Sequence, residues 1–191
     1  GRGLHPARVV SAFVDLPYLL LLDSASIQEP VGRYSYLTAD PFLVLRCKGA
    51  RIEVLKGGAP GALQGDPFAV LRRLLLSFPV AKLPGFPPFQ GGAAGYLAYD
   101  LGRLLERIPE RARDDLALPD LYLGFYDWVL AYDAGAGESF LLSTGWPEGT
   151  FQHAQARFNE VERRVRSAMS QFTIALALTS GLRGCSSRAL A

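Results

Sequence analysis

Residues 88–106 read PFQGGAAGYLAYDLGRLLE, and this stretch carries the strongest structural signal in the chain. Three of its glycines, Gly91, Gly92 and Gly95, precede an apolar and aromatic run that ends in a charged turn. A glycine cluster can hold a phosphate, but the Gly-Lys-Ser/Thr ending of a phosphate loop is missing, and so is the spacing of a dinucleotide fingerprint. At the entrance of a strand, glycines permit a positive φ or a close backbone approach. We therefore expect a strand over 92–99, followed by a short helix or turn over 101–107.

The segments before this stretch read as strands. The apolar run 18–22 lies between Pro17 and the polar Asp23, and its shortness favours a buried strand over a helix. Residues 33–37 are expected to form a second strand.

A hairpin is predicted next, with arms at 42–46 and 51–55. In the second arm, apolar Ile52 and Val54 alternate with charged residues, as expected for a half-buried strand. Residues 56–65 contain four glycines and a proline, a composition that predicts an exposed loop.

Two helices are expected. The first begins at Asp66-Pro67, because Asp can accept hydrogen bonds from free amide groups and Pro fits the first helical position. Its apolar face consists of Phe68, Leu71, Leu74, Leu75 and Phe78. The second is capped near Thr150 and buries Phe151, Ala154, Phe158, Val161, Val165 and Met169. Its water-facing side is expected to carry Arg157, Glu160, Arg163 and Arg164.

The rest of the chain adds strands and an unusual end. A long apolar and aromatic strand pair is expected over 121–132, followed by a turn at 134–137 and a strand at 139–143. Several predicted strands together with two predicted helices indicate an α+β fold, in which antiparallel β-sheets pack against a few helices. No acidic residue follows Glu162. We therefore expect one domain over 1–170 and an atypical tail over 171–191 that is either disordered or foreign to the rest of the chain.

Composition limits the function classes. The 191 residues are 49% hydrophobic, enough for a continuous core, and the net charge of +2 is spread along the chain. Neither nucleic acid nor a membrane is an expected partner, and the location is expected to be cytoplasmic. Cys47 and Cys185, with only two histidines in the chain, give neither a disulfide framework nor a zinc spacing. No metal site is expected.

Two groups of charged residues have two interpretations each. Asp100, Arg103 and Glu106 could form a catalytic cluster, but they also suit a solvent-facing turn. Asp114 and Asp115 could bind a metal, although the arginines beside them favour a solvated loop.

Two further features carry no assigned chemistry. His153 is expected on a partly exposed helix face, with no nucleophile or carboxylate that its spacing identifies. A series of aromatic residues could stack bases or sugars, but it has no basic residues interleaved, so packing in a core is favoured. Its members are Tyr122, Phe125, Tyr126, Trp128 and Tyr132.

Three separated motifs carry a family resemblance. They are LLDSA at 21–25, GRYSYL at 32–37 and the stretch 88–106, supported by DPF at 66–68 and LPDLYLGFYD at 118–127. Together they resemble the amino-terminal region of the chorismate-utilising synthases, above all aminodeoxychorismate synthase component I, with anthranilate synthase component I next. The resemblance spans about 19–166, and it implies a fold like the amino-terminal part of anthranilate synthase component I.

One candidate ligand site follows from the first two motifs. Ser24 comes directly after one strand and Arg33-Tyr34 begin the next, so their polar groups could converge at one edge of a sheet. In the other interpretation, Ser24 caps a turn and Arg33 pairs with a surface acid. The resemblance implies a tryptophan pocket, in which Ser24 contacts the amino or carboxylate end of the ligand. Val31, Gly32, Arg33 and Tyr34 would line it, with the other wall supplied by a carboxyl half.

The resemblance also implies an activity. Component I adds ammonia to chorismate in a Mg-dependent reaction, and a glutamine amidotransferase subunit or domain supplies the ammonia. The residues for chorismate, Mg and acid–base chemistry belong to the carboxyl half, so we expect no catalytic residue and no cofactor site in this chain, and no activity from it alone. Asp23 and Gln90 favour the aminobenzoate (folate) branch. The alternatives are an anthranilate synthase component I fragment, a stand-alone module that binds an amino acid such as tryptophan, and a structural scaffold.

Overall fold

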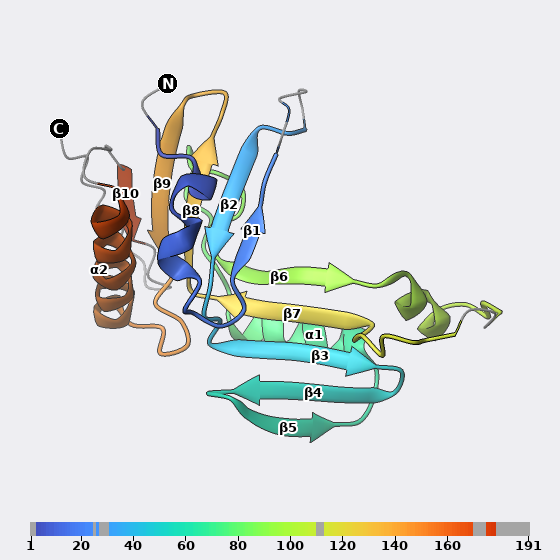
Figure 1. Cartoon of the computed structure of the whole chain (residues 1–191). Coiled ribbons are helices and arrows are strands. Elements are labelled where there is room, and N and C mark those ends of the chain that lie inside the picture. The colour runs from blue at the N-terminus through green and yellow to red at the C-terminus, as the bar shows by residue number, and fades with distance from the viewer. Residues whose placement is uncertain (1–2, 25, 27–30, 110–112, 170–174, 179–191) are drawn as a thin grey trace. The chain divides into compact units, whose positions relative to one another are not determined.

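The computed structural model describes residues 3–24, 26, 31–109, 113–169 and 175–178 (Figure 1). The chain divides into two compact units, and both are discontinuous in sequence. The first unit comprises residues 1–41, 78–92 and 126–191, and the second comprises residues 42–77 and 93–125. The chain therefore passes from one unit to the other four times.

The first unit is built on a five-stranded sheet. Across the sheet, the strands are β1 (Leu20–Leu22), β2 (Tyr34–Thr38), β8 (Trp128–Asp133), β9 (Glu138–Ser143) and β10 (Ala175–Leu178). The pairs β1–β2, β2–β8 and β8–β9 are antiparallel, whereas β10 is parallel to β9. Two short 3₁₀ helices, η1 (Pro6–Arg8) and η2 (Val10–Phe13), precede the sheet, and α2 (Phe151–Ala168) follows β9. Figure 1 shows α2 beside β9 and β10.

Both faces of this sheet are covered. Leu37, Leu130 and Leu141 are register partners on three adjacent strands, and they pack against α2 and the 3₁₀ helices. The other face carries Val129, Ala131, Phe140 and Leu142, which contact Leu83, Phe86 and Phe89. Strands that are buried on both faces read as continuous apolar runs, which explains the composition of β8 and β9.

The second unit contains the other five-stranded sheet. Its strands, in order across the sheet, are β5 (Ala59–Leu63), β4 (Arg51–Lys56), β3 (Leu43–Lys48), β7 (Leu121–Tyr126) and β6 (Gly92–Leu97). β3 is antiparallel to both β4 and β7. The unit also contains α1 (Pro67–Ser77) and the 3₁₀ helix η3 (Tyr99–Leu104). The two antiparallel sheets with few helices confirm the predicted fold class.

Most of the predicted elements are present. Thr150 caps α2 by accepting a hydrogen bond from the His153 amide at 3.2 Å, and both carboxylate oxygens of Asp66 accept amide hydrogen bonds at the start of α1. The predicted apolar face of α1 is partly wrong, because Val70 is buried whereas Leu75 is exposed.

Residues 56–65 were wrongly predicted as a loop. They contain β5, which pairs with β4 at the edge of the second sheet. All five β5 residues are exposed, so the strand forms without burying side chains. Its backbone hydrogen bonds are made to β4. Pro60 is tolerated because an edge strand leaves one side unpaired.

The apolar run 121–132 is divided at Asp127. β7 ends at Tyr126 and β8 begins at Trp128, and the two strands belong to different sheets. Of the aromatic residues in this region, Phe125, Tyr126 and Trp128 are buried, in agreement with the packing role.

The glycines at 91–95 have the predicted role. Gly91 has a φ of 124°, and a Cβ there would lie 2.6 Å from Thr144 Cγ2. At Gly95, which has a φ of 153°, a Cβ would overlap the carbonyl oxygen of Tyr122 on the neighbouring strand. The backbones of β6 and β7 approach too closely there for any side chain.

Of the tail predicted over 171–191, the structure describes only β10. The other tail residues lie outside the described part, Cys185 among them, so the boundary at 170 stays a prediction. Cys47 is buried in β3.

Candidate ligand-binding site

The candidate site lies where β1 ends and β2 begins. The two strands are antiparallel, with Leu22 opposite Tyr36, so Ser24 and Tyr34 come together at one edge of the sheet. β8 is the next strand, and its last residue, Asp133, is opposite Tyr34. Residues 25 and 27–30, which connect β1 to β2, lie outside the described part of the chain.

Ser24 joins the two strands. Its hydroxyl donates a hydrogen bond to the Tyr34 carbonyl oxygen at 2.8 Å, and its amide donates to Ser35 Oγ at 3.2 Å. Ser35 in turn donates to Asp23 Oδ1 at 2.7 Å. The Ser24 hydroxyl proton is therefore engaged, while its oxygen can still accept a hydrogen bond from a ligand.

Arg33 is paired with an acid that the sequence analysis did not identify. Its Nε and Nη2 donate to Asp133 Oδ1 and Oδ2 at 2.8 and 2.7 Å. The Asp133 side chain is only 9% exposed, whereas that of Arg33 is 40% exposed. The hydrogen bond from Arg33 lowers the pKa of Asp133 below its ordinary value. The expected pairing of Arg33 with an acid is present, but the acid is a buried strand residue.

An aromatic surface adjoins this pair. The Arg33 guanidinium lies 5.2 Å from the centroid of the Tyr34 ring. Tyr34 stacks on Tyr36 with centroids 6.1 Å apart, and Tyr36 makes an edge contact with Phe89. Burial raises the pKa of Tyr36. The site thus combines a cation with a face of aromatic rings.

His5 is a further residue that the sequence analysis missed. Its Nε2 lies 3.3 Å from Asp23 Oδ1, and its ring contacts the edge of Tyr132 at 5.1 Å. No local pattern could have indicated this, because His5 lies far from Asp23 and Tyr132 in the sequence. Of the predicted lining residues, Gly32 has a φ of 81° and Val31 is exposed.

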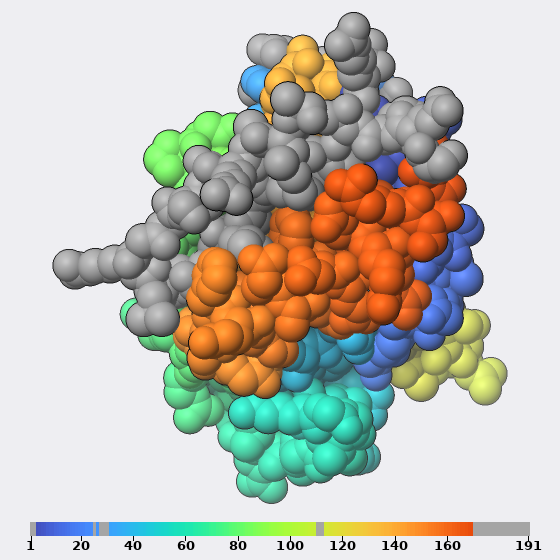
Figure 2. Space-filling view, turned by 90° about the vertical axis from the view of Figure 1, so that its left-hand side faces the viewer, coloured from blue at the N-terminus to red at the C-terminus, as the bar shows by residue number. Residues whose placement is uncertain are grey.

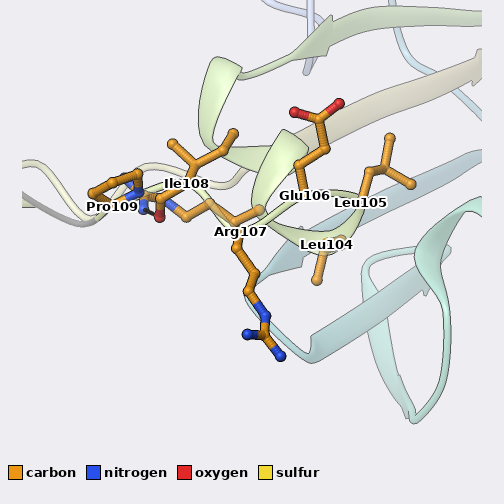
Figure 3. A pocket seen from close by; sticks show the side chains of 7 residues that line it. Leu104, Leu105, Glu106, Arg107, Ile108 and Pro109 are labelled. Carbon is orange, nitrogen blue, oxygen red and sulfur yellow. Dashed lines mark hydrogen bonds between the residues drawn. The ribbon is translucent and has the colours of Figure 1, made fainter.

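The charged turn after β6 does not form a converging cluster. Arg103 Nε donates to Asp100 Oδ1 at 2.8 Å, and Arg103 Nη1 donates to the Ile108 carbonyl at 2.7 Å. Residues 103–109 line a shallow hollow of about 580 Å³. Figure 3 shows that Glu106 and Arg107 point in opposite directions. This geometry favours the surface-pair interpretation.

Asp114 belongs to an ion-pair group. Lys48 Nζ lies 2.6 Å from Asp114 Oδ2 and 3.1 Å from Asp120 Oδ1, and Asp120 Oδ2 accepts the Gly49 amide. The Lys48 hydrogen bond lowers the pKa of Asp114. Among the described residues, no three His, Cys, Asp or Glu side chains lie close enough together to hold a metal ion.

On α2, the partners of one residue were not identified and the exposure of another was predicted wrongly. Spacing identified no carboxylate for His153, and the structure places two beside it: its Nδ1 lies 2.8 Å from Glu148 Oε2 and its Nε2 lies 3.6 Å from Asp127 Oδ2. Arg157 was expected to face water, but its side chain is only 13% exposed because Asp40 and Asp127 hold it. Both acids are distant in sequence, so helical periodicity could not reveal them.

None of the helices among the described residues has both the length and the apolar character needed to cross a membrane.

Comparison with known proteins gives a consistent set of relatives. The chain is 32% identical over 171 residues to aminodeoxychorismate synthase component 1 of Salmonella typhimurium, an alignment that covers 89% of this chain and 36% of the relative. It is 35% identical over 129 residues to anthranilate synthase component 1 of Acetivibrio thermocellus, covering 67% of this chain and 26% of the relative. The chain thus spans about a third of these relatives. No family model matches the chain.

A solved structure supports the same fold. The crystal structure of anthranilate synthase component I from Streptococcus pneumoniae TIGR4 superposes with a TM-score of 0.58 at 20% identity. The match covers 74% of this chain and 31% of that chain, in its amino-terminal part.

Proposed function

Because the chain is related to the amino-terminal part of component I of the aminodeoxychorismate and anthranilate synthases, we propose that it is the non-catalytic amino-terminal domain of an aminodeoxychorismate synthase component I. The complete enzyme would convert chorismate and ammonia from glutamine into 4-amino-4-deoxychorismate, a precursor of para-aminobenzoate and folate. The observation that carries the proposal is the alignment of 89% of this chain with 36% of the Salmonella relative.

The internal pairing of the charged residues supports a non-catalytic role. Arg33 is bound to Asp133, Arg103 to Asp100 and Lys48 to Asp114. Groups engaged in this way hold strands and turns together, whereas a catalytic acid or base needs access to a reacting atom. The chorismate and Mg sites, and the chemistry, are assigned to a carboxyl region like that of the longer relatives.

Two residues favour the aminobenzoate branch over the anthranilate branch. Asp23 stands where the anthranilate motif has Glu, and it accepts the Ser35 hydroxyl. Gln90 is buried, and its side-chain amide bonds to Leu83 and Pro87. An anthranilate synthase component I fragment is the alternative. In this proposal, the complete enzyme receives its ammonia from a glutamine amidotransferase subunit or domain, and it is located in the cytoplasm.

A chimera tests this function. The chain replaces the matched amino-terminal part of the Salmonella component 1, and the chimera is assayed with chorismate, Mg²⁺ and ammonia. We expect 4-amino-4-deoxychorismate from the chimera and no product from the isolated chain. Product from the isolated chain, or an inactive but folded chimera, would contradict the proposal.

A second candidate function concerns the site at Ser24, Val31, Gly32, Arg33 and Tyr34. We propose that these residues form one wall of a pocket for tryptophan or a related amino acid. The stacked Tyr34 and Tyr36 rings offer a surface for an aromatic side chain, and the Ser24 oxygen can accept from the ligand's ammonium group. Calorimetric titration with tryptophan tests this, as described in the Discussion.

A further inference from the structure

The second sheet has two edge strands, β5 and β6, at opposite ends of its strand order (Figure 1). An edge strand presents a row of backbone N–H and C=O groups that can pair with a further strand. Figure 2 shows the β5 edge at the molecular surface, in turquoise. Pro60 lies within β5 and takes one backbone donor away from that edge. β5 thus carries one of the usual protections against further pairing.

β6 has a different composition. Residues 92–99 read GAAGYLAY, with neither a charged residue nor a proline. The first charge after the strand is Asp100, whose carboxylate is paired with Arg103 at 2.8 Å. Natural proteins usually place charges or a proline on an edge strand, because an edge without them accepts another strand. The chemistry of β6 therefore leaves this edge open to pairing.

The carboxyl end of β6 exposes large side chains on both faces of the sheet. Tyr96 and Leu97 point to opposite faces, because side chains alternate along a strand. Tyr96 is 43% exposed and Leu97 is 55% exposed, and Tyr99, just after the strand, is 85% exposed. Three neighbouring side chains of this kind form a continuous surface that a partner can cover.

Tyr96 begins an aromatic row that runs across the sheet. Its ring stacks on Tyr122 of β7, with centroids 5.9 Å apart and an angle of 11° between the ring planes. Since β7 lies on the inner side of β6, a strand added on the outer side would bring its own side chain next to the Tyr96 ring. A third aromatic ring in that position would extend the row.

The backbone of β6 indicates which residue can pair outward. The Ala98 amide donates to the Asp120 carbonyl at 2.7 Å, on the side of β7. Because backbone groups alternate in direction along a strand, the N–H and C=O of Leu97 point away from β7. Leu97 is thus a residue through which a further antiparallel strand can form its hydrogen bonds.

A second copy of β6 satisfies all of these features in one antiparallel register. With a two-fold axis at residue 96, the Tyr96 rings of the two copies become direct cross-strand neighbours. Leu97 then pairs with Gly95 of the second copy, so a large side chain lies opposite a residue that has none. Asp100 lies near Gly92 of the second copy, so no like charges meet across the contact.

We propose that β6 is the docking edge for a second copy of this chain, which adds its own β6 as an antiparallel strand with the two-fold axis at Tyr96. An identical strand is a suitable occupant because β6 is uncharged, whereas two copies of a charged edge would repel each other. The inference concerns the second sheet alone, and it does not depend on the proposed function.

Sedimentation velocity of the chain over a series of concentrations tests this proposal. We expect an equilibrium between monomer and dimer in the micromolar range. Leu97→Lys places two positive charges close to the two-fold axis and should raise the dimer dissociation constant by at least about tenfold. Leu76→Lys is the matched control, because Leu76 is 72% exposed on α1. It should leave the dissociation constant unchanged.

Hydrogen exchange of the wild type gives a second readout that needs no variant. The amides of β6 should exchange more slowly as the protein concentration rises, because the dimer covers this edge. The amides of β3, which lies between β4 and β7, should exchange at the same rate at every concentration. If Leu97→Lys does not fold, this concentration dependence decides.

Four results would overturn the proposal. The first is a wild type that stays monomeric at every concentration, and the second is a dimer that Leu97→Lys does not weaken. The third is equal weakening by Leu97→Lys and Leu76→Lys, which would place the contact elsewhere. The fourth is protection of the β6 amides that does not change with concentration, which would assign this edge to a segment of the same chain.

Discussion

Arg33 and Asp133 hold β2 and β8 together through two parallel hydrogen bonds at 2.7 and 2.8 Å, although they are 100 positions apart in the sequence. The pair lies at the same edge of the sheet as Ser24. Because Asp133 also accepts the amides of Gly135 and Ala136, it fixes the turn between β8 and β9 as well. The candidate ligand site is therefore built on a rigid edge.

Replacing Arg33 should weaken the fold. Arg33→Met leaves the nearly buried Asp133 carboxylate without its cation, and we expect a loss of about 1–2 kcal/mol in unfolding free energy, discounted because Arg33 is partly exposed. Urea denaturation at pH 7 measures this. Arg166→Met, which removes an exposed pair, should change the unfolding free energy by no more than about 0.5 kcal/mol.

The contribution of this pair should depend on pH. The pKa of Asp133 is lower in the folded chain than in the unfolded chain. The stability that it adds is therefore complete above the unfolded pKa of about 4, and it is lost as pH falls through the folded pKa. The difference between wild type and Arg33→Met should shrink below about pH 4. A constant difference between pH 7 and pH 3 would contradict this assignment.

Tryptophan should bind weakly to the isolated chain. The proposed pocket has one wall here, and the other is assigned to a carboxyl region, so we expect a Kd of about 1 mM or weaker, equivalent to about −4 kcal/mol. Calorimetric titration measures the affinity. Micromolar binding that is lost in Ser24→Ala and Arg33→Met would instead favour a stand-alone amino-acid-binding module.

The close approach of β6 and β7 predicts a large difference between two glycine substitutions. Gly95→Ala places a Cβ on the Tyr122 carbonyl oxygen and should lower the unfolding free energy by about 2–4 kcal/mol. Gly58→Ala is the control, since Gly58 also has a positive φ, of 82°, but has no atom within 4 Å of the added carbon. Its cost should be about 1 kcal/mol. Equal melting temperatures for the two variants would show that the strands can separate locally.

Local patterns predicted much of the fold. Thr150 and Asp66 cap helices because capping depends on residues within the first turn. The convergence of Ser24 with Tyr34 followed from two short strands close in sequence. By contrast, β5 was missed because an edge strand can form through backbone hydrogen bonds to its neighbour, even when its own composition is typical of a loop.

The wrong exposure predicted for Arg157 and the unidentified partners of His153 and Arg33 have a shared cause. A helical period indicates which side of a helix is apolar, but not which distant acids approach its polar side. Asp40 and Asp127 reach Arg157 from positions 117 and 30 residues away. Asp133 reaches Arg33 through strand pairing between distant parts of the chain. Such partners become visible only when the topology is known.

The interleaved course of the chain has a consequence for inheritance. Each unit is assembled from separated segments, so no single cut in the gene would release either one intact. A single recombination event within 42–125 would divide both units, so neither unit could be exchanged for a counterpart from another protein in one step.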